Sequence, residues 1–399
     1  MRKPKKTRPV RSTDSDVVEY MYRTIPAGMG RDRGQRRGVT AGKGKAAKPI
    51  GGEKPSRWKR AVKHLLILCA VILLLAGIWV GWKFASNAIK IFGWKGLTEA
   101  LKPAKLDGED QGRVTILLAG NSADDPGHSG AELTDSIMIV SINTATNTGY
   151  LLSIPRDLYV AIPGYSYGKI NEVYQNGKQT GFSEAGYAAA GMGLLEKVVS
   201  QNFGVKIHYY ALVNYTALQQ AVDAVGGIQI IVDSSDPRGL YDPSRDLATG
   251  SPLVDLPNGK VYLNGRNALN LARARGQGAG SYGFPRSDFD RTKYQRQILI
   301  GLKDRAISAG TLSNPIKLGE LFDAMGSNVD TDLELNEVRR AYELAGKIPS
   351  SSLVSASLSE ANGKNLLQSY RTPSGQSALI PALGVDDFTD IRAYVGSLP

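Results

Sequence analysis

The sequence predicts an α/β (α+β) protein: a single external domain with a central mixed β-sheet flanked by helices, preceded by one transmembrane helix. Two observations support this prediction. From Arg113 onward, short apolar segments of strand length alternate with segments of helical periodicity. Before them, a long uncharged apolar run separates this region from a strongly basic N-terminal segment. The chain contains no internal repeat, so one sheet is expected.

Residues 1–60 are predicted to form a disordered basic tail in the cytoplasm. Residues 1–64 hold 19 Lys and Arg against 5 Asp and Glu, whereas the rest of the chain holds 30 against 32. With few large apolar residues, the tail cannot bury enough surface to offset the entropy of ordering. Contact with anionic membrane lipid is favoured over nucleic-acid binding, because the tail shows no regular interleaving of aromatic and basic residues and no known nucleic-acid-binding fold. Nucleic acid is therefore not an expected partner.

Residues 61–84 are predicted to form the transmembrane helix. The eighteen residues from Leu65 to Trp82 carry no charge, close to the ~20 apolar residues that span a bilayer. Basic residues precede this run, so the positive-inside rule places the N-terminus in the cytoplasm and everything after Lys83 outside. A cleavable signal peptide is the alternative, but the run starts far into the chain and no A-x-A-like site follows it. We therefore expect a single-pass protein of the cell membrane.

Residues 85–111 are predicted to be a juxtamembrane linker and residues 112–396 the folded domain. Apolar runs bounded by turn residues predict the strands, and longer periodic segments predict the helices. Glycines at the end of 215–227 mark a helix C-terminus. Strands are expected at 113–120, 136–143, 149–155, 208–214 and 228–233, and helices at 183–202, 215–227, 288–309 and 335–346.

Residues 265–297 carry the most specific chemical signal. Arg273 and Arg275 close an apolar helical run, and a glycine-rich loop follows. Asp288, Arg291 and Gln295 are spaced by three and four residues, which places them on one stripe of a helix. Guanidinium groups are permanently charged forks suited to phosphate oxygens. The stretch therefore indicates a site for a phosphorylated ligand, with or without a metal ion; a solvated helix face with surface ion pairs is the equally weighted alternative.

Further polar residues follow the ends of predicted strands. Asp135 directly precedes the strand at 136–143, and Arg156 follows the strand at 149–155. Lys169 and Asn171 come shortly afterwards. Functional groups commonly lie at strand ends in such proteins, although satisfied loop residues lie there too.

The order of these motifs resembles the LytR-CpsA-Psr family over roughly residues 112–396. The resemblance rests on TDSIM, SIPRD, KIN, VGGI, LNGRNAL, RAR and D-x-x-R-x-x-x-Q, followed by SALIPALGVDDFTDIRAYV near the C-terminus. Each motif alone is weak, but the ordered series is specific. The cytoplasmic tail, single membrane helix and external domain match the family's architecture as well.

The resemblance implies a phosphotransferase that moves a glycopolymer from a polyprenyl-pyrophosphate carrier to peptidoglycan, with Mg²⁺ as cofactor. It implies an apolar pocket for the prenyl chain, for which residues 185–199 and 215–225 are candidates, with core packing as the alternative. By the same resemblance, the catalytic residues would be Asp135, Asp288 and Arg275; the pyrophosphate-binding residues Arg156, Arg273, Arg275, Arg291, Gln295, Lys169 and Asn171; and the metal ligands Asp135 and Asp288.

One position departs from the family pattern. Members commonly carry an aspartate two residues after the glycine of the first strand, as a metal ligand, and here Ser122 stands there. A hydroxyl is a poor substitute for a carboxylate toward Mg²⁺. Asp124 or Asp125 is the expected compensation, or the metal is held more loosely.

Two other functions remain open from the sequence. A pyrophosphatase would use the same charges and give the polymer phosphate to water. A non-enzymatic surface or regulatory protein would only bind an anionic glycolipid, and Ser122 favours that reading.

The charge asymmetry around Leu65–Trp82 predicts the topology. Protease added to intact cells or spheroplasts is expected to degrade the domain at 112–396 and to spare the tail at 1–60. Immunoblots with antibodies against each segment would measure this. Protection of the domain with loss of the tail would reverse the orientation.

Overall fold

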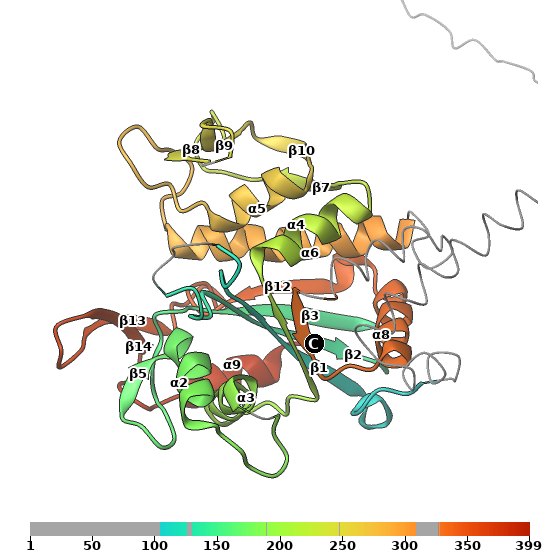
Figure 1. Ribbon diagram of the computed structural model, residues 1–399, viewed down its shortest axis with the longest axis vertical. Coiled ribbons are helices and arrows are strands. Elements are labelled where there is room, and N and C mark those ends of the chain that lie inside the picture. Colours follow the sequence, from blue (N-terminus) through green and yellow to red (C-terminus); the bar gives the residue numbers. More distant parts are fainter. Residues whose placement is uncertain (1–103, 126–129, 189, 247, 309–325, 327) are drawn as a thin grey trace, which may run out of the picture. The chain divides into compact units, whose positions relative to one another are not determined.

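The computed structural model describes residues 104–125, 130–188, 190–246, 248–308, 326 and 328–399 (Figure 1). The predicted tail, the predicted transmembrane helix and most of the predicted linker lie outside these residues. No helix within the described ranges is both long enough and apolar enough to cross a bilayer.

The centre of the domain is a six-stranded mixed sheet with the order β11-β6-β1-β2-β3-β12. Strands β1, β2 and β3 form an antiparallel meander, while β6 runs parallel to β1 and β12 parallel to β3. The predicted mixed sheet is thus confirmed. Its strands are β1 (Arg113–Gly120), β2 (Ser136–Asn143), β3 (Thr148–Ile154), β6 (Tyr209–Val213), β11 (Val329–Thr331) and β12 (Leu353–Ser357).

One face of the sheet packs on helices α3 (Ala190–Phe203) and α9 (Thr389–Ser397), beside α2 (Val173–Thr180) (Figure 1). Alternate residues of the strands, such as Leu117 and Ile139, are fully buried in this core. The helix predicted at 183–202 begins only at Ala190. Gly186 adopts φ 89°, which a helix cannot accommodate, and so the preceding residues form a loop.

The opposite face of the sheet packs on α6 (Asp288–Ser308), over which lie α4 (Tyr215–Ala224) and α5 (Gly265–Arg273) (Figure 1). These helices enclose a second apolar core together with two hairpins. Helix α4 ends three residues before the predicted 227, because Gly226 and Gly227 both take positive φ values. The hairpins are β7 (Ile228–Val232) with β10 (Gly259–Leu263), and β8 (Leu240–Arg245) with β9 (Pro252–Leu256).

The remaining elements are small and lie at the edges. Helix α8 follows the prediction to within one residue, whereas the short hairpins β4–β5 and β13–β14, like β8–β9, were not predicted. These elements are α8 (Leu335–Lys347), β4 (Tyr159–Ala161) with β5 (Tyr167–Lys169), β13 (Leu367–Arg371) with β14 (Ser377–Pro381), and 3-10 turns at Glu109–Gln111, Ile170–Glu172 and Ser350–Ser352.

Helix α6 is fastened to the sheet by a buried arginine. The side chain of Arg296 is 3% exposed and donates to the hydroxyls of Ser355 and Ser153 at 2.7 and 2.6 Å. Burial lowers the pKa of Arg296 to about 10, but the guanidinium remains charged at neutral pH. Two strands that are far apart in sequence are therefore tied to one turn of α6.

Glu196 of α3 gives the fold a pH dependence. Its carboxylate is 6% exposed and accepts a hydrogen bond from the Ala188 N–H at 3.0 Å. Burial raises its pKa from 4.5 to about 6, and the charge of Asp332 adds to this effect. The folded state favours the protonated carboxyl of Glu196. The contribution of this protonation to the free energy of unfolding is therefore full below pH 4.5 and is lost as the pH rises through 6.

Glu196→Gln keeps the volume and an acceptor oxygen but removes the ionisation. Relative to the wild type, the variant is expected to gain about 2 kcal/mol in the free energy of unfolding on going from pH 4 to pH 8. Denaturant titrations of both proteins at the two pH values measure the gain. An equal stability difference at both pH values would contradict the assigned burial effect.

Candidate active site

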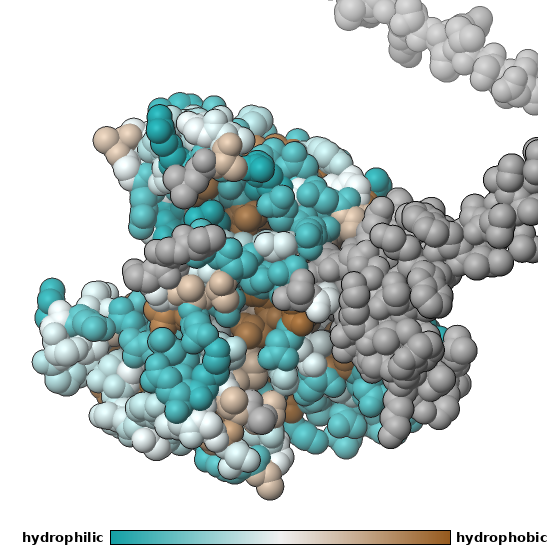
Figure 2. Space-filling model, in the orientation of Figure 1, coloured by the Kyte–Doolittle hydropathy of each residue, from teal (hydrophilic) through white to brown (hydrophobic). Residues whose placement is uncertain are grey.

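A cavity of about 380 Å³ lies between the sheet and the helices above it. One part of its lining is apolar and is called the apolar wall below, and the other part is polar and charged and is called the mouth. Figure 2 shows apolar side chains reaching the surface in the hollow between the upper helices and the sheet. The apolar wall includes Leu118, Met138, Val213, Leu218, Leu269, Ile298 and Leu299, and the polar mouth includes Asn121, Asp135, Arg156, Arg273, Arg275, Gln277, Arg291 and Gln295.

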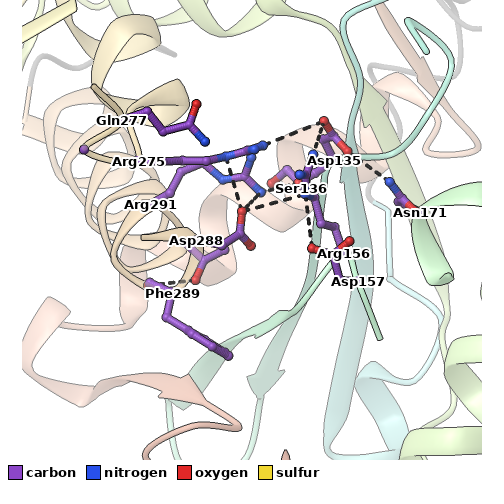
Figure 3. Close-up of polar contacts among 12 residues, drawn as sticks. Asp135, Ser136, Arg156, Asp157, Asn171, Arg275, Gln277, Asp288, Phe289 and Arg291 are labelled. Atoms are coloured by element: carbon purple, nitrogen blue, oxygen red, sulfur yellow. Dashed lines mark hydrogen bonds and ion pairs between the residues drawn. The ribbon is translucent and has the colours of Figure 1, made fainter. Parts of the chain in front are cut away.

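Asp135 and Arg156 meet where β2 begins and β3 ends. Arg156 donates from Nη1 to Asp135 Oδ2 at 2.8 Å, and Asn171 donates from its amide to Asp135 Oδ1 at 3.1 Å (Figure 3). The two strands are antiparallel neighbours, so the start of one and the end of the other lie at the same edge. The sequence prediction that these strand-end residues form part of a site is consistent with this placement.

Arg275, Asp288 and Arg291 complete the network from the other side (Figure 3). The Asp288 Oδ1 atom lies 2.9 Å from Arg291 Nη2, 3.4 Å from Arg275 Nε and 3.8 Å from Arg156 Nε. Arg291 also donates to the backbone carbonyl of Asp135 at 2.7 Å. The predicted stripe on α6 therefore faces the strand-end residues across the mouth of the cavity.

The network leaves buried polar atoms without hydrogen-bond partners. The Nε atoms of Arg156, Arg275 and Arg291 donate no hydrogen bond, and Asp288 Oδ1 accepts none. Unmade hydrogen bonds of buried groups cost of the order of 1–3 kcal/mol each. Three such donors at one cavity mouth fit an anionic ligand with several oxygens.

Electrostatics keep the site ionised. Burial opposes the ionisation of Asp135, but the charge of Arg156 and the hydrogen bonds from Asn171 and Arg156 outweigh it and hold the pKa of Asp135 below its usual value. Burial lowers the pKa of Arg291 to about 10, an effect that Asp288 partly offsets. Both groups are thus charged at neutral pH.

Asp242, which the sequence analysis missed, fixes the loop that carries Arg275. Its Oδ2 atom accepts from the backbone N–H groups of Arg275, Gly276 and Gln277 at 3.0, 2.8 and 3.4 Å. Gly276 allows this arrangement with φ 67°, where a Cβ would meet Phe284 at 2.6 Å. Asp242 is fully buried, and no local spacing in the sequence links it to a loop more than thirty residues away.

Gln295 and Arg273 line the same cavity away from the carboxylate pair. The Gln295 amide donates to the Ala272 carbonyl and accepts from the Ser136 hydroxyl, each at 2.9 Å, which joins α6 to α5 and β2. Arg273 lies over the ring of Tyr215 at 4.8 Å, with Asp125 3.7 Å from its Nη2. Both residues are brought to the predicted site.

Lys169 and Asn171 reach the network only through other residues, and neither lines the cavity. Lys169 donates to Asp157 Oδ1 at 2.7 Å, and Asp157 lies 3.6 Å from Arg156 Nε. Asn171 holds Asp135. These two residues therefore help to position Arg156 and Asp135 and do not line the cavity themselves.

No residue of 185–199 lines this cavity, and the alternative of core packing holds for the part of this segment in α3. Helix α3 packs against the other face of the sheet, where Leu194, Leu195 and Val198 belong to the first core. Residues of α4, namely Tyr215 and Leu218, do line the cavity, as predicted for 215–225. The small and aliphatic composition of α3 and α4 could not show which helix lines the cavity and which packs in the core, because both helices bury an apolar face.

The position of Ser122 bears on the predicted metal ligands. Asp124 accepts from the N–H groups of Tyr215 and Thr216 at 3.2 and 2.7 Å and so holds the N-terminus of α4. Asp125 lies beside Arg273. Among the residues that the structure describes, no three His, Cys, Asp or Glu side chains gather in a metal-binding cluster. The carboxylate of Asp288, which is ion-paired with arginines, is nevertheless the ligand type that Mg²⁺ uses when substrate phosphates supply the rest.

Comparison with known proteins agrees with this architecture. The model of the LytR_cpsA_psr family matches residues 88–378. The chain belongs to the LytR-CpsA-Psr family. The resemblance seen in the ordered motifs is thereby confirmed.

Relatives within the family carry different names. A polyisoprenyl-teichoic acid–peptidoglycan teichoic acid transferase, TagU of Oceanobacillus iheyensis, is 32% identical over 231 residues, which cover 58% of this chain and 62% of that protein. The regulatory protein MsrR of Staphylococcus aureus is 29% identical over 227 residues, 56% of this chain and 58% of its own length. The chain thus spans about three fifths of the length of these two relatives.

Solved structures share the fold. TagV of Bacillus subtilis aligns with a TM-score of 0.52 at 23% identity, over 71% of this chain and 95% of that one. TagT bound to LIIa-WTA aligns with a TM-score of 0.53 at 21% identity, over 74% and 94%. At these identities the likeness concerns the fold alone.

Arg275→Lys tests whether the fork geometry matters. Lysine keeps the charge but loses the planar pair of donors, so turnover of a pyrophosphate-linked substrate is expected to fall about a hundredfold or more. The melting temperature should stay within a few degrees. Arg266→Lys, at an arginine that lies beside Asp246 and does not line the cavity, is the matched control. Unfolding of the Arg275 variant would make this arginine structural.

Proposed function

We propose that the chain is a membrane-anchored phosphotransferase that moves a glycopolymer from a polyprenyl-pyrophosphate carrier to peptidoglycan. The observation that carries the proposal is the cluster of Arg156, Arg275 and Arg291 at the mouth of a cavity with an apolar wall, where their Nε atoms make no hydrogen bond of good geometry. A charged head group and a long apolar tail are the two parts of the proposed carrier. Apolar burial is worth about 0.8 kcal/mol per CH₂, so the tail would supply much of the affinity while the arginines fix the head.

The chemistry is an in-line displacement at the phosphorus that bears the glycopolymer. An acceptor sugar hydroxyl forms the new P–O bond, and the bond to the lipid phosphate breaks. Arg156, Arg275 and Arg291 would stabilise the charge that develops on the phosphate oxygens and on the leaving lipid phosphate. Asp135 or Asp288 would take the proton of the attacking hydroxyl, since both are carboxylates at the mouth of the cavity.

Mg²⁺ is proposed as the cofactor, with Asp288 and Asp135 as its protein ligands. When bound, it would neutralise charge on the phosphate oxygens. The carboxylates are surrounded by guanidinium groups, so the free protein offers a cation little net negative charge. We therefore expect the metal to bind together with the pyrophosphate, whose oxygens would complete its coordination.

The membrane anchor is part of the proposal. An apolar helix at 61–84 would hold the external domain near its lipid-linked substrate and raise the effective concentration of that substrate. The basic tail at 1–60 would contact anionic lipid on the cytoplasmic side.

Two alternatives follow from particular observations. Water in place of the sugar hydroxyl would make the protein a polyprenyl-pyrophosphate-glycan pyrophosphatase, because the charges required are the same. A non-enzymatic regulatory role, with anionic glycolipid as ligand, is favoured by Ser122 and by the name of the relative MsrR.

The deciding experiment incubates the full chain with a lipid-linked oligosaccharide, a peptidoglycan acceptor and Mg²⁺. Transfer should give an oligosaccharide joined to peptidoglycan through a phosphodiester, together with free lipid phosphate. Omission of Mg²⁺ should slow the reaction about tenfold or more. Free oligosaccharide phosphate would identify the pyrophosphatase, and unchanged lipid-linked substrate would identify the binding protein.

A further inference from the structure

The β4–β5 hairpin carries aromatic side chains right beside the arginine–carboxylate network. Tyr159 pairs with Lys169 and Ala161 with Tyr167, so Tyr159, Tyr167 and Lys169 share one face of the hairpin. Lys169 binds Asp157, which adjoins Arg156. The chain advances at most about 3.6 Å per residue, so the Cα atoms of Arg156 and Tyr159 lie within about 11 Å. The hairpin surface therefore continues the site.

Tyr167 is held firmly and yet remains open to solvent. Its ring stacks on Tyr159 with 5.6 Å between centroids, and Tyr159 contacts Tyr370 at 5.5 Å. Its hydroxyl donates to the Asp386 carboxylate, but 43% of the residue is exposed. An aromatic ring whose orientation is fixed in advance loses little entropy when a ligand stacks on it.

Neighbouring segments extend this surface. Just before Asp386 in the chain come Leu383 and Val385, which are 53% and 40% exposed. Strand β14 is tied to the start of the hairpin by the Leu379 N–H, which donates to the Asp157 carbonyl at 2.9 Å. In Figure 1, β5, β13 and β14 lie together at one edge of the domain.

By the order of strands in the sheet, the β4–β5 hairpin and the apolar wall of the cavity lie on opposite sides of Arg156. Strands β6, β1 and β2 supply the sheet residues of the cavity wall. Strand β3 lies beyond β2, and the hairpin follows β3 after Arg156. In an in-line displacement the acceptor and the leaving group lie on opposite sides of the phosphorus. With the leaving lipid phosphate toward the apolar wall, the acceptor approaches from the side of the hairpin.

We propose that the tyrosine surface formed by Tyr159, Tyr167 and Tyr370 is the subsite for the acceptor glycan strand. The apolar face of an amino-sugar ring would stack on Tyr167, one or two sugars away from the hydroxyl that attacks. This inference rests on the proposed transferase function. A lipid surface fits the hairpin less well, because the cation Lys169, which could attract anionic lipid, is already paired with Asp157.

The test compares Tyr167→Ala with two matched variants in the full chain. Tyr167→Phe keeps the ring, and Tyr165→Ala removes a tyrosine of the same 43% exposure outside the stack. The probe is a linear peptidoglycan oligosaccharide without peptide, used both as acceptor in the transfer assay and as sole ligand in calorimetry. Tyr167→Ala should raise the acceptor KM and the dissociation constant about fivefold to tenfold. The donor KM should not move, and both matched variants should stay within about twofold of the wild type.

Other outcomes of this test would contradict the acceptor subsite or assign the tyrosines to another ligand. An unchanged acceptor KM for Tyr167→Ala, or an equal loss for Tyr165→Ala, overturns the subsite. A raised donor KM instead assigns the tyrosines to the donor glycan and also overturns it. Weaker binding to phospholipid vesicles, with unchanged oligosaccharide binding, would make the surface a membrane contact. If no variant or wild type transfers glycan but calorimetry shows the Tyr167-dependent binding, the transferase function fails while the glycan subsite stands.

Discussion

The coupling of α6 to the ends of β2 and β3 through buried guanidinium groups is the constraint on which the site depends. Arg291 is 4% exposed and binds both the Asp135 carbonyl and the Asp288 carboxylate. One turn further along, Arg296 binds hydroxyls of β3 and β12. A buried charge without partners is costly, so α6 has one favourable register on the sheet. That register sets the distance between Asp288 and Arg156, and with it the shape of the cavity mouth.

At the mouth of the cavity, arginines and carboxylates balance one another in charge, but not all of their hydrogen-bonding groups are used. Arginines from the end of β3, from the loop after α5 and from α6 surround two carboxylates, yet their Nε atoms make no hydrogen bond of good geometry. Asp242 fixes the loop that carries Arg275. It accepts hydrogen bonds from the backbone N–H groups of this loop and does not contact the guanidinium group. The loop position is thereby fixed while the charged end of Arg275 stays available. Such preorganisation lets an anion bind without the protein reorganising around it.

Sequence patterns predicted the parts of this arrangement that depend on local periodicity. The three- and four-residue spacing of Asp288, Arg291 and Gln295 predicted their common face, and apolar runs predicted β1, β2 and β3 closely. Contacts between distant segments have no such local signal. Asp242 under the Arg275 loop could not be predicted for this reason, nor could the engagement of Asp124 at the N-terminus of α4. Helices α3 and α4 have similar composition, and only the chain's path decides which of them lines the cavity.

The long separations in sequence across the site have a consequence for how the protein is made. Arg291 and Asp135 are 156 residues apart, and Arg296 and Ser153 are 143 apart. The antiparallel strands β1, β2 and β3 follow one another along the chain and can pair early, whereas closing loops of about 150 residues is slow. The arginine–carboxylate network would thus be assembled after most of the chain has been synthesised. Until then the half-formed sheet exposes the strand edge that β12 later covers, and this interval is when the nascent protein is most open to misassembly.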